Sequence, residues 1–407
     1  MLEEWASPAA QAQCTNVTCM CFDDKANCNP YGPLNGNCTK NSDMYFGSVQ
    51  PFLNMTVRGF AFYQGENNLE FDAGNSADKT GYACLFPAMI ADWRASWSAV
   101  PGTTDPLAPF VFASIADGSD ESFGVNMAAL RHAQSASYGA VPNALMPMTA
   151  QALTHALGDV WDADSCGDRG CCVDDYIDLG PTCVGDHRGF WSVNGTGWFQ
   201  GCVHPRPKGI LGRQMAQVTA ALAYARAPQL SGPTLAGCTA AGATLTLRFN
   251  ESLLAGAPVT WSANASRANE TTALYVLAGA TLPATYAAGH HGPPGDYKGC
   301  YANGNELGVE GWVAVDAVVS GDSELTADLS PLAGATPTAV RYAWGTGGWG
   351  TGYQNRMCCG PSVNVAVTPC APDSCPLHAG GLPGVPFVAE ITPAGRCKCA
   401  PPQVCDL

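Results

Sequence analysis

Short apolar runs alternate with helical patterns between residues 57 and 157, and this alternation constrains the fold more than any other feature. Residues 57–63 (VRGFAFY), 108–115 (APFVFASI) and 144–153 (ALMPMTAQAL) are the apolar runs. Neither of the first two alternates with polar residues, so both read as strands buried on two faces. Strands of this kind, separated by helices, predict an α/β fold with a parallel sheet covered by helices in a three-layer arrangement.

The helical patterns lie between and after these runs. In residues 84–97, Leu85, Met89, Trp93 and Trp97 recur every fourth residue and form one apolar stripe. Residues 126–138 (NMAALRHAQSASY) give a second helical pattern. A third begins near residue 204 and carries an apolar face of Leu211, Met215, Val218 and Leu222.

From about residue 227, apolar residues recur at every second position rather than with the period of a helix. Pro228 and Pro233 end the preceding helix, and six segments then follow with strand patterns. Clusters of Gly, Pro and Asn separate them. We therefore expect a β-rich, sandwich-like carboxyl-terminal domain. The segments are ATLTLRF, TTALYVLA, WVAVDAVV, ELTADL, AVRYAW and PFVAEI.

These patterns predict three regions. Residues 1–45 form a Cys-rich loop pinned by disulfides, residues 46–227 the α/β domain, and residues 228–407 the β-rich domain. The α/β domain carries an insertion at 157–202 that is rich in Asp, Gly and Cys. A zinc knuckle in the first region and a calcium loop at 162–173 are less favoured alternatives, because the first lacks histidine and the second has Cys166 and Val173 at ligand positions.

The composition indicates an oxidising compartment. The chain of 407 residues holds 20 cysteines, which is typical of a secreted or lysosomal protein rather than a cytosolic one. A net charge of −15 argues against nucleic acid and anionic membranes as partners. Asn-x-Ser/Thr sequons agree with a secretory route; they stand at Asn16, Asn37, Asn54, Asn194, Asn250, Asn264 and Asn269.

The first residues, MLEEWASPAAQAQC, have neither the basic region nor the apolar run of a signal peptide. No segment reaches about 18 uninterrupted apolar residues, so we expect no membrane span. If the protein is secreted, its targeting sequence is expected to lie outside this chain.

Polar residues that follow the first apolar run are the candidate site. Gln64 offers amide donors, Gly65 a backbone N–H without a side chain in front of it, and Glu66 a carboxylate. Ligands of parallel sheets bind at the carboxyl ends of strands, where such donors suit a tetrahedral oxyanion. A hydrogen-bonded turn is the alternative for this stretch taken alone. His204 precedes a helix, where the partial positive charge favours a neutral imidazole and thus a general base; a capping or surface histidine is the alternative.

Four segments in order resemble the sialate O-acetylesterase family, a branch of the SGNH-type hydrolases. They are VRGFAFYQGENN, FPAMIADWR, LRHAQ and CVHPRPKGILGRQMA. LEEWAS near the start, and AVRYAW and CPLHAGGLPGVPFVAEI near the end, are similar to further parts of that family. The resemblance implies an SGNH-like esterase domain followed by a β-rich segment, without metal or organic cofactor.

The resemblance also implies roles for individual residues. His204 is the general base, and Gln64 and Gly65 are the donors on the oxyanion side. Glu66 and Asn68 order the site, with Asn68 and Arg131 (in LRHAQ) as candidate substrate-binding residues. Many SGNH enzymes carry Asp three residues before the histidine, but Gly201 stands there, so Asp178 is the substitute candidate for orienting the base.

The nucleophile of the family is missing. Relatives carry their serine in a Gly-Gln-Ser-Asn type motif upstream of the Trp-containing segment, and this sequence has no such motif. We therefore expect the chain to begin inside the domain and to be inactive, or nearly so, by itself. The SGDSEL stretch with Ser323 resembles the Gly-Asp-Ser motif of the wider superfamily, but a strand pattern rather than a helix follows it.

The expected function is removal of O-acetyl groups from sialic acid or a related acetylated sugar. The sequence does not indicate which sugar is the substrate, which position is acetylated or which glycan carries it. Two alternatives belong to other classes: a non-catalytic carbohydrate-binding relative, and an extracellular structural glycoprotein held by disulfides. The remaining histidines lack the spacing of a metal site and are expected to be structural or exposed; they are His132, His155, His187, His290, His291 and His378.

Overall fold

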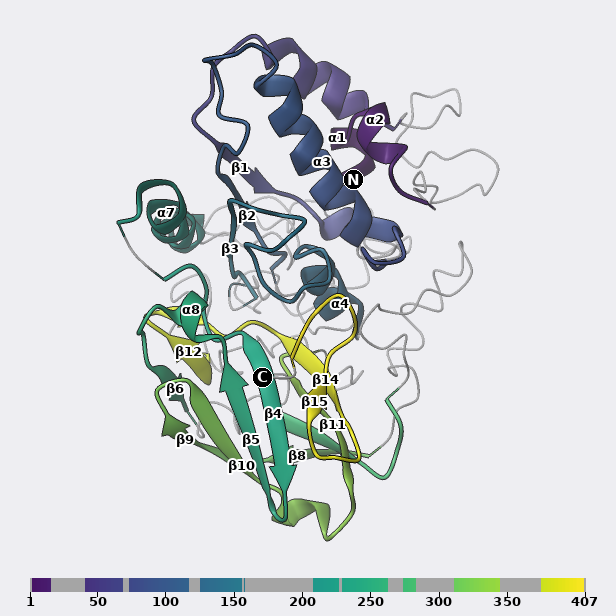
Figure 1. Cartoon of the computed structure of the whole chain (residues 1–407), viewed down its shortest axis with the longest axis vertical. Coiled ribbons are helices and arrows are strands. Elements are labelled where there is room, and N and C mark those ends of the chain that lie inside the picture. Colours follow the sequence, from purple (N-terminus) through teal and green to yellow (C-terminus); the bar gives the residue numbers. More distant parts are fainter. Residues whose placement is uncertain are drawn as a thin grey trace, which may run out of the picture.

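A computed structural model shows a small parallel sheet with helices around it, and a β-rich part that packs against this unit (Figure 1). The structure describes residues 2–15, 41–68, 73–116, 125–155, 157, 208–226, 229–262, 274–282, 311–344 and 375–405.

The parallel sheet has the order β1-β2-β3. Its strands are Phe60–Tyr63, Phe110–Ala113 and Thr149–Ala152. Both pairings are parallel, with Phe60 opposite Phe110 and Phe110 opposite Thr149. This confirms the predicted parallel sheet and the three apolar runs that form it, whereas the SGNH-type layering of a whole domain stays a prediction.

Helices cover both faces of this sheet. In β2, Phe110 and Phe112 belong to the core cluster that contains α3. The residues between them point the other way: Val111 packs with Val218 of α7, and Ala113 with other residues of that helix. All four side chains of β2 are buried. The lack of alternation in the sequence therefore reflects burial on two sides.

Helix α3 spans Gly81–Trp97, and its predicted stripe of Leu85, Met89, Trp93 and Trp97 is buried as expected. α4 spans Val125–Ala133 and ends before the predicted limit of residue 138. The chain turns there because Ala136 and Ser137 adopt positive φ angles of 56° and 62°. α7 spans Lys208–Tyr224 and covers β2 and β3.

The first residues differ from the predicted loop. Leu2–Trp5 form α1 and Pro8–Gln11 form α2, and Leu2 is completely buried in the core beside α3. Ser7 caps α2 by accepting a hydrogen bond from the Ala10 N–H at 3.0 Å. Helices of four residues are too short to show periodicity, which is why the sequence pattern missed them.

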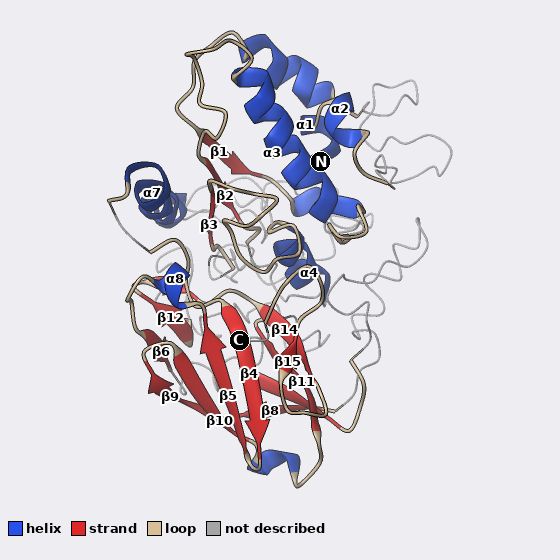
Figure 2. Ribbon diagram, viewed as in Figure 1, coloured by secondary structure: helices blue, strands red, loops and turns tan. Residues whose placement is uncertain are grey.

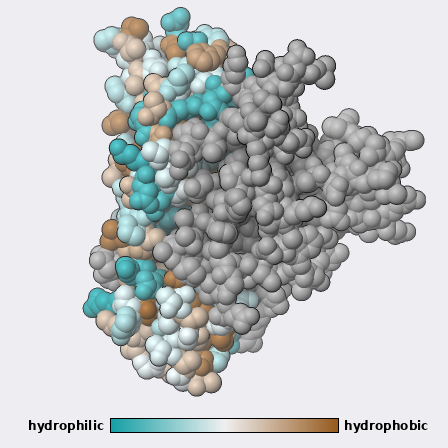
Figure 3. Space-filling view, turned by 90° about the vertical axis from the view of Figure 1, so that its right-hand side faces the viewer, coloured by the Kyte–Doolittle hydropathy of each residue, from teal (hydrophilic) through white to brown (hydrophobic). Residues whose placement is uncertain are grey.

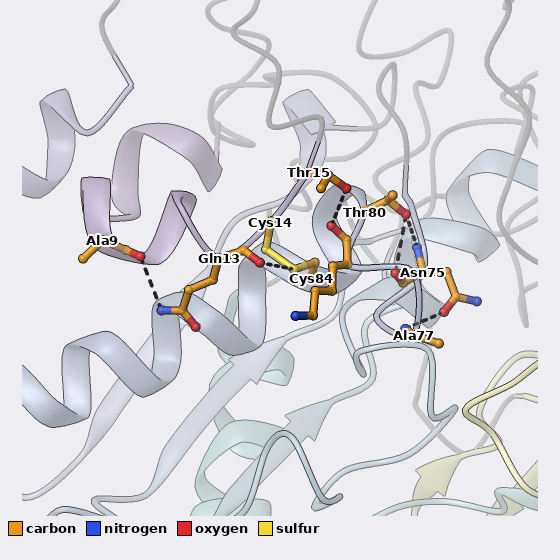
Figure 4. Close-up of a disulfide and its surroundings, with 9 residues drawn as sticks. Ala9, Gln13, Cys14, Thr15, Asn75, Ala77, Thr80 and Cys84 are labelled. Carbon is orange, nitrogen blue, oxygen red and sulfur yellow. Dashed lines mark hydrogen bonds between the residues drawn. A yellow bond between two sulfur atoms is a disulfide. The ribbon is translucent and has the colours of Figure 1, made fainter.

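A disulfide between Cys14 and Cys84 ties the segment after α2 to the first turn of α3 (Figure 4). The chain pairs again directly after it, because the Thr15 N–H donates to the Lys79 carbonyl at 2.8 Å. The described part of residues 1–45 is thus tied to α3 by a disulfide. Short helical elements follow in the described part of the chain: η1 Tyr45–Val49, η2 Gln50–Phe52 and η3 Glu66–Asn68.

The carboxyl-terminal part consists of antiparallel sheets that share one core. Leu245, Val276 and Val340, from two of the sheets, are fully buried in that core. The β-rich character is as predicted. The first sheet has the order β4 (Leu235–Ala241), β5 (Thr244–Phe249), β10 (Glu324–Asp328), β9 (Ala317–Gly321). The second sheet has the order β15 (Cys397–Lys398), β14 (Phe387–Ile391), β11 (Pro337–Tyr342), β7 (Leu274–Ala278), β8 (Trp312–Val315). The third sheet has the order β13 (Leu382–Pro383), β12 (Leu377–Ala379), β6 (Val259–Trp261), and the short helices α8 (Glu251–Leu254) and η6 (Ser330–Leu332) lie between strands in the sequence.

The two parts contact each other directly (Figure 2). Trp344 and Val388 from the β-rich part belong to the core cluster beside α3, and the Asn75 Nδ2 donates to the Pro401 carbonyl at 2.9 Å. His155, which follows β3, lies with its Nε2 3.9 Å from the Cys375 Sγ. The predicted domain limits at residues 45 and 227 remain predictions.

In the described ranges, no helix is long and apolar enough to cross a membrane. On the described part of the face in Figure 3, hydrophobic residues are interspersed in small groups among hydrophilic ones. Residues 158–207, which hold most of the predicted insertion and its calcium-loop alternative, lie outside the described residues, as do Cys19, Cys21, Cys28 and Cys38.

We expect the Cys14–Cys84 disulfide to stabilise the protein more than the Cys399–Cys405 disulfide does. The first closes a sequence separation of 70 and the second one of 6. Loss of loop-closure entropy from the unfolded chain then gives about 4 and about 2 kcal/mol, respectively. Chemical unfolding of the two double Cys→Ala variants, with wild type as reference, measures both values. An equal or reversed order would contradict the expectation.

We also expect His155 to destabilise the protein at acid pH. Burial, with Arg131 nearby, lowers the pKa of His155 from 6.5 to about 3. The unfolded chain therefore takes up a proton below pH 6.5 that the folded protein does not, and stability is lost as pH falls from there. Between about pH 7 and about pH 4 this amounts to about 3 kcal/mol. Over this pH range, the unfolding free energy of His155→Gln should fall by about 3 kcal/mol less than that of wild type. If the two curves of unfolding free energy against pH were parallel, the imidazole would not contribute.

Candidate active site

The candidate site lies where the strands of the parallel sheet end. Gln64 follows β1 directly, Ile115 and Ala116 follow β2, and His155 follows β3. α4 supplies Arg131 to the same edge. The carboxyl ends of three parallel strands thus meet beside polar side chains, which is the usual place for a ligand site in such a sheet.

Hydrogen bonds hold Gln64 on both its side chain and its backbone. Its Nε2 donates to the Asn68 Oδ1 at 2.8 Å. Its carbonyl oxygen accepts from the Gln134 Nε2 at 3.2 Å and from the Tyr82 hydroxyl at 3.4 Å. Since Nε2 carries two hydrogens, one remains after the bond to Asn68. Among the described residues, no acceptor takes this second hydrogen.

Gly65 cannot be replaced without strain, for two reasons. Its φ of +146° is a conformation that residues with a Cβ rarely adopt. A Cβ there would also lie 2.7 Å from the Ile115 Cγ2. The Gly65 carbonyl accepts from the Asn68 N–H at 2.8 Å, which closes the η3 turn. Within the part of the chain that the structure describes, the Gly65 N–H donates to no acceptor, so it is a second available donor beside Gln64.

Asn68 is buried, with 2% of its surface exposed, and both ends of its amide are engaged. Its Nδ2 donates to the two carboxyl oxygens of Glu3, at 3.3 and 3.0 Å. Its Oδ1 accepts from the Leu2 N–H at 3.0 Å as well as from Gln64. Asn68 thus holds Leu2, Glu3 and Gln64 together by hydrogen bonds, and its predicted roles in ordering the site and in binding substrate both stay predictions.

Glu66 lies in η3 and interacts with the hydroxyl of Tyr63 at the end of β1. Burial raises the pKa of Tyr63, and the Glu66 carboxylate raises it further, so the phenol stays protonated and can donate to the carboxylate. The Lys208 Nζ lies 4.7 Å from the centre of the Tyr63 ring. This contact brings the first residue of α7 to the same strand end.

Arg131 is buried and supports the end of β2. Its Nε donates to the Ile115 carbonyl at 3.0 Å, and a terminal nitrogen donates to the Ala116 carbonyl at 3.2 Å. Only 4% of the residue is exposed. These bonds fix the backbone of the sheet edge, and a contact of Arg131 with a substrate stays a prediction.

Two predicted residues, His204 and Asp178, lie outside the described residues. Of the predicted set, the structure brings together Gln64, Gly65, Glu66 and Asn68 at the end of β1. Ser323 does not belong to this group: it lies in the turn between β9 and β10, and its hydroxyl donates to the Glu251 carboxylate at 2.9 Å. A strand follows it, as its sequence indicates.

Sequence reasoning missed several residues that contact the predicted ones, among them Glu3, Tyr82 and Gln134. Besides holding the Gln64 carbonyl, Gln134 accepts the Ile115 N–H at 3.0 Å and so joins the ends of β1 and β2. The signal was present, because Glu3 lies in LEEWAS and Gln134 in LRHAQ, two of the segments that carry the family resemblance. Nothing in their spacing shows that they reach Gln64.

Curated relatives match part of the chain. Sialate O-acetylesterase from Rattus norvegicus is 35% identical over 142 residues, which is 33% of this chain and 24% of that protein. The Homo sapiens sialate O-acetylesterase is 33% identical over 138 residues, with the same shares. The chain thus spans about a quarter of the length of these relatives. No family model matches the sequence.

A solved structure described as a novel carbohydrate acetylesterase from Xanthomonas citri aligns with this chain. The alignment covers 84% of this chain and 52% of the solved one. Its TM-score of 0.47 and identity of 18% are too low to carry an argument about the fold. The sequence matches carry the relationship by themselves. Over about a third of its length, the chain is similar in sequence to the sialate O-acetylesterases, the family that its motifs resemble.

Proposed function

We propose that the chain contributes the oxyanion side and the general base of a carbohydrate acetylesterase site. The observation that carries the proposal is the pair of donors at the end of β1: the second amide hydrogen of Gln64 and the Gly65 N–H. Both come from a rigid strand end, and fixed donors of this kind stabilise the charge that develops on a carbonyl oxygen during acyl transfer.

In the proposed reaction, a serine attacks the acetyl carbonyl while His204 takes its proton. The oxyanion that forms is held by Gln64 and Gly65, and it collapses as the sugar oxygen leaves with that proton. Water then attacks the acetyl-serine with His204 again as base, and acetate is released. Glu66 and Asn68 order the donors, and Asp178 is the proposed partner of His204.

The position of α7 supports the role of His204. Lys208, the first residue of this helix, contacts Tyr63 at the end of β1. It follows His204 by four residues, and such a segment spans at most about 14 Å. The connection is therefore short enough for the imidazole to serve the edge that carries Gln64.

We propose O-acetylated sialic acid, or a related acetylated sugar, as the substrate. The names of the curated relatives support this choice. The secretory route proposed from the cysteine content agrees with a glycan substrate. The serine itself is proposed to lie outside residues 1–407, because the sequence contains no Gly-Gln-Ser motif and Ser323 is bonded elsewhere. Sequencing the transcript upstream of Met1 tests this point; absence of the motif there would favour a carbohydrate-binding relative.

Residues 1–407 should show no hydrolysis of acetyl esters above background and no labelling by a fluorophosphonate, which reacts with activated serines. The physical reason is the missing nucleophile, since donors and a base alone do not form an acyl intermediate. Release of acetate from acetylated sialosides and mass spectrometry of the labelled protein are the measurements. Hydrolysis that is abolished by Ser323→Ala would contradict the proposal.

The chain should bind an O-acetylated sialoside more tightly than its deacetylated form, and Gln64→Ala should weaken binding of the acetylated form alone. Loss of one neutral hydrogen bond, worth about 0.5–1.5 kcal/mol, predicts a rise in Kd of roughly 2- to 10-fold. Calorimetric titration measures both sugars. Gln50→Ala, at an exposed position in η2, is the matched control. Equal affinity for the two sugars would argue against an acetyl site.

A further inference from the structure

Glu3 is an unusual residue for the place where it lies. It belongs to α1, a helix of four residues, and only 7% of its surface is exposed. Burial raises the pKa of its carboxyl group, while the hydrogen bond from Asn68 lowers it in part. The α-amino group, Glu4 and Tyr82 are the titratable groups that interact with it. A buried carboxyl group is costly for stability, so packing alone does not explain its presence.

The presence of Glu3 is explained by the orientation of the Asn68 side-chain amide. A side-chain amide has an acceptor end and a donor end of nearly equal shape, and its partners decide which way it faces. At the Oδ1 end of Asn68, the Leu2 N–H and the Gln64 Nε2 both donate. At the Nδ2 end, the Glu3 carboxyl group accepts with both oxygens. Glu3 therefore provides the acceptor that keeps the oxygen of Asn68 turned toward Gln64.

The same contact sets the direction of the Gln64 amide. Its Nε2 points at the Asn68 Oδ1, while its Oε1 lies 3.4 Å from the Tyr82 hydroxyl, which shares its one hydrogen between this oxygen and the Gln64 carbonyl. If Asn68 turned over, its NH₂ group would face the NH₂ group of Gln64. Two donors cannot bond each other, so Gln64 would turn as well and present its oxygen where a donor is needed.

We propose that Glu3 is a positioning residue for the acetyl site, acting through Asn68 to keep the Gln64 amide in its donating orientation. It touches neither the substrate nor the reacting atoms. The proposal rests on the proposed function, in which Gln64 donates to the acetyl carbonyl. The acceptor that holds this arrangement comes from a residue 61 positions before Gln64 in the chain.

The orientation itself can be measured without any substrate. In protein labelled with ¹⁵N-glutamine, the Gln64 amide is assigned through Gln64→Ala. We expect its hydrogen-bonded proton to exchange slowly with water in wild type and in Glu3→Gln, which keeps a carbonyl acceptor for Asn68. In Glu3→Leu, which has no acceptor, the exchange should become several-fold faster. Exchange that is unchanged in Glu3→Leu would overturn the proposal.

Binding of the acetylated sialoside separates positioning from a merely structural role. Glu3→Leu should raise Kd about 2- to 10-fold, as loss of the Gln64 hydrogen bond does. The double variant Glu3→Leu/Gln64→Ala should bind no more weakly than Gln64→Ala alone, because both changes remove the same contact. Additive losses would show that Glu3 acts by another route. Asp78→Asn, at an exposed position, is the control for the loss of one negative charge and should leave Kd unchanged.

If thermal unfolding shows that Glu3→Leu does not fold, Glu3→Asp replaces it in the exchange experiment. It keeps the charge but is shorter by one methylene, so it withdraws the acceptor from Asn68 and should also speed exchange of the Gln64 amide. The two readouts also separate the two proposals. Failure of wild type to bind any acetylated sugar contradicts the acetyl site, whereas the exchange experiment then still decides whether Glu3 orients Gln64.

Discussion

The Phe110 side chain lies where β1, β2 and α3 meet, and the rest of the α/β part depends on its burial. Its ring contacts those of Phe60, Phe62, Phe86 and Trp93, with centroids 5.7 to 6.1 Å apart. Aromatic pairs at such distances stabilise beyond the area they bury. Because this cluster fixes the helix against two strands, it also fixes where those strands end, and thus where Gln64 and Ile115 stand.

The regular elements could be predicted because their patterns are local. The stripe of α3 and the continuous apolar runs of β1 and β2 are each visible within about a dozen residues. α1 and α2 could not be predicted in this way, since their stability comes from burial of Leu2 and Ala6 against a distant helix. The early end of α4 depends on two residues with positive φ, which no hydrophobic pattern records.

The contacts of the candidate site were predictable only in part, for a related reason. Gln64, Gly65 and Glu66 are visible in the sequence because an apolar run stops at them. The partners that fix their geometry come from other elements: Gln134 from the segment after α4, Tyr82 from α3 and Glu3 from α1. Contacts over such separations are created by the fold, so spacing along the chain carries no trace of them. The family resemblance marked two of the three segments without explaining what they do.

One contact at this site is made by the backbone alone. The Leu2 N–H donates to the Asn68 Oδ1, and every amino acid except proline brings the same donor. The side chain at position 2 packs in the core, whereas the donor belongs to the main chain and is retained when the side chain is changed. Substitutions of the Leu2 side chain therefore leave in place the main-chain donor that Leu2 contributes to the candidate site.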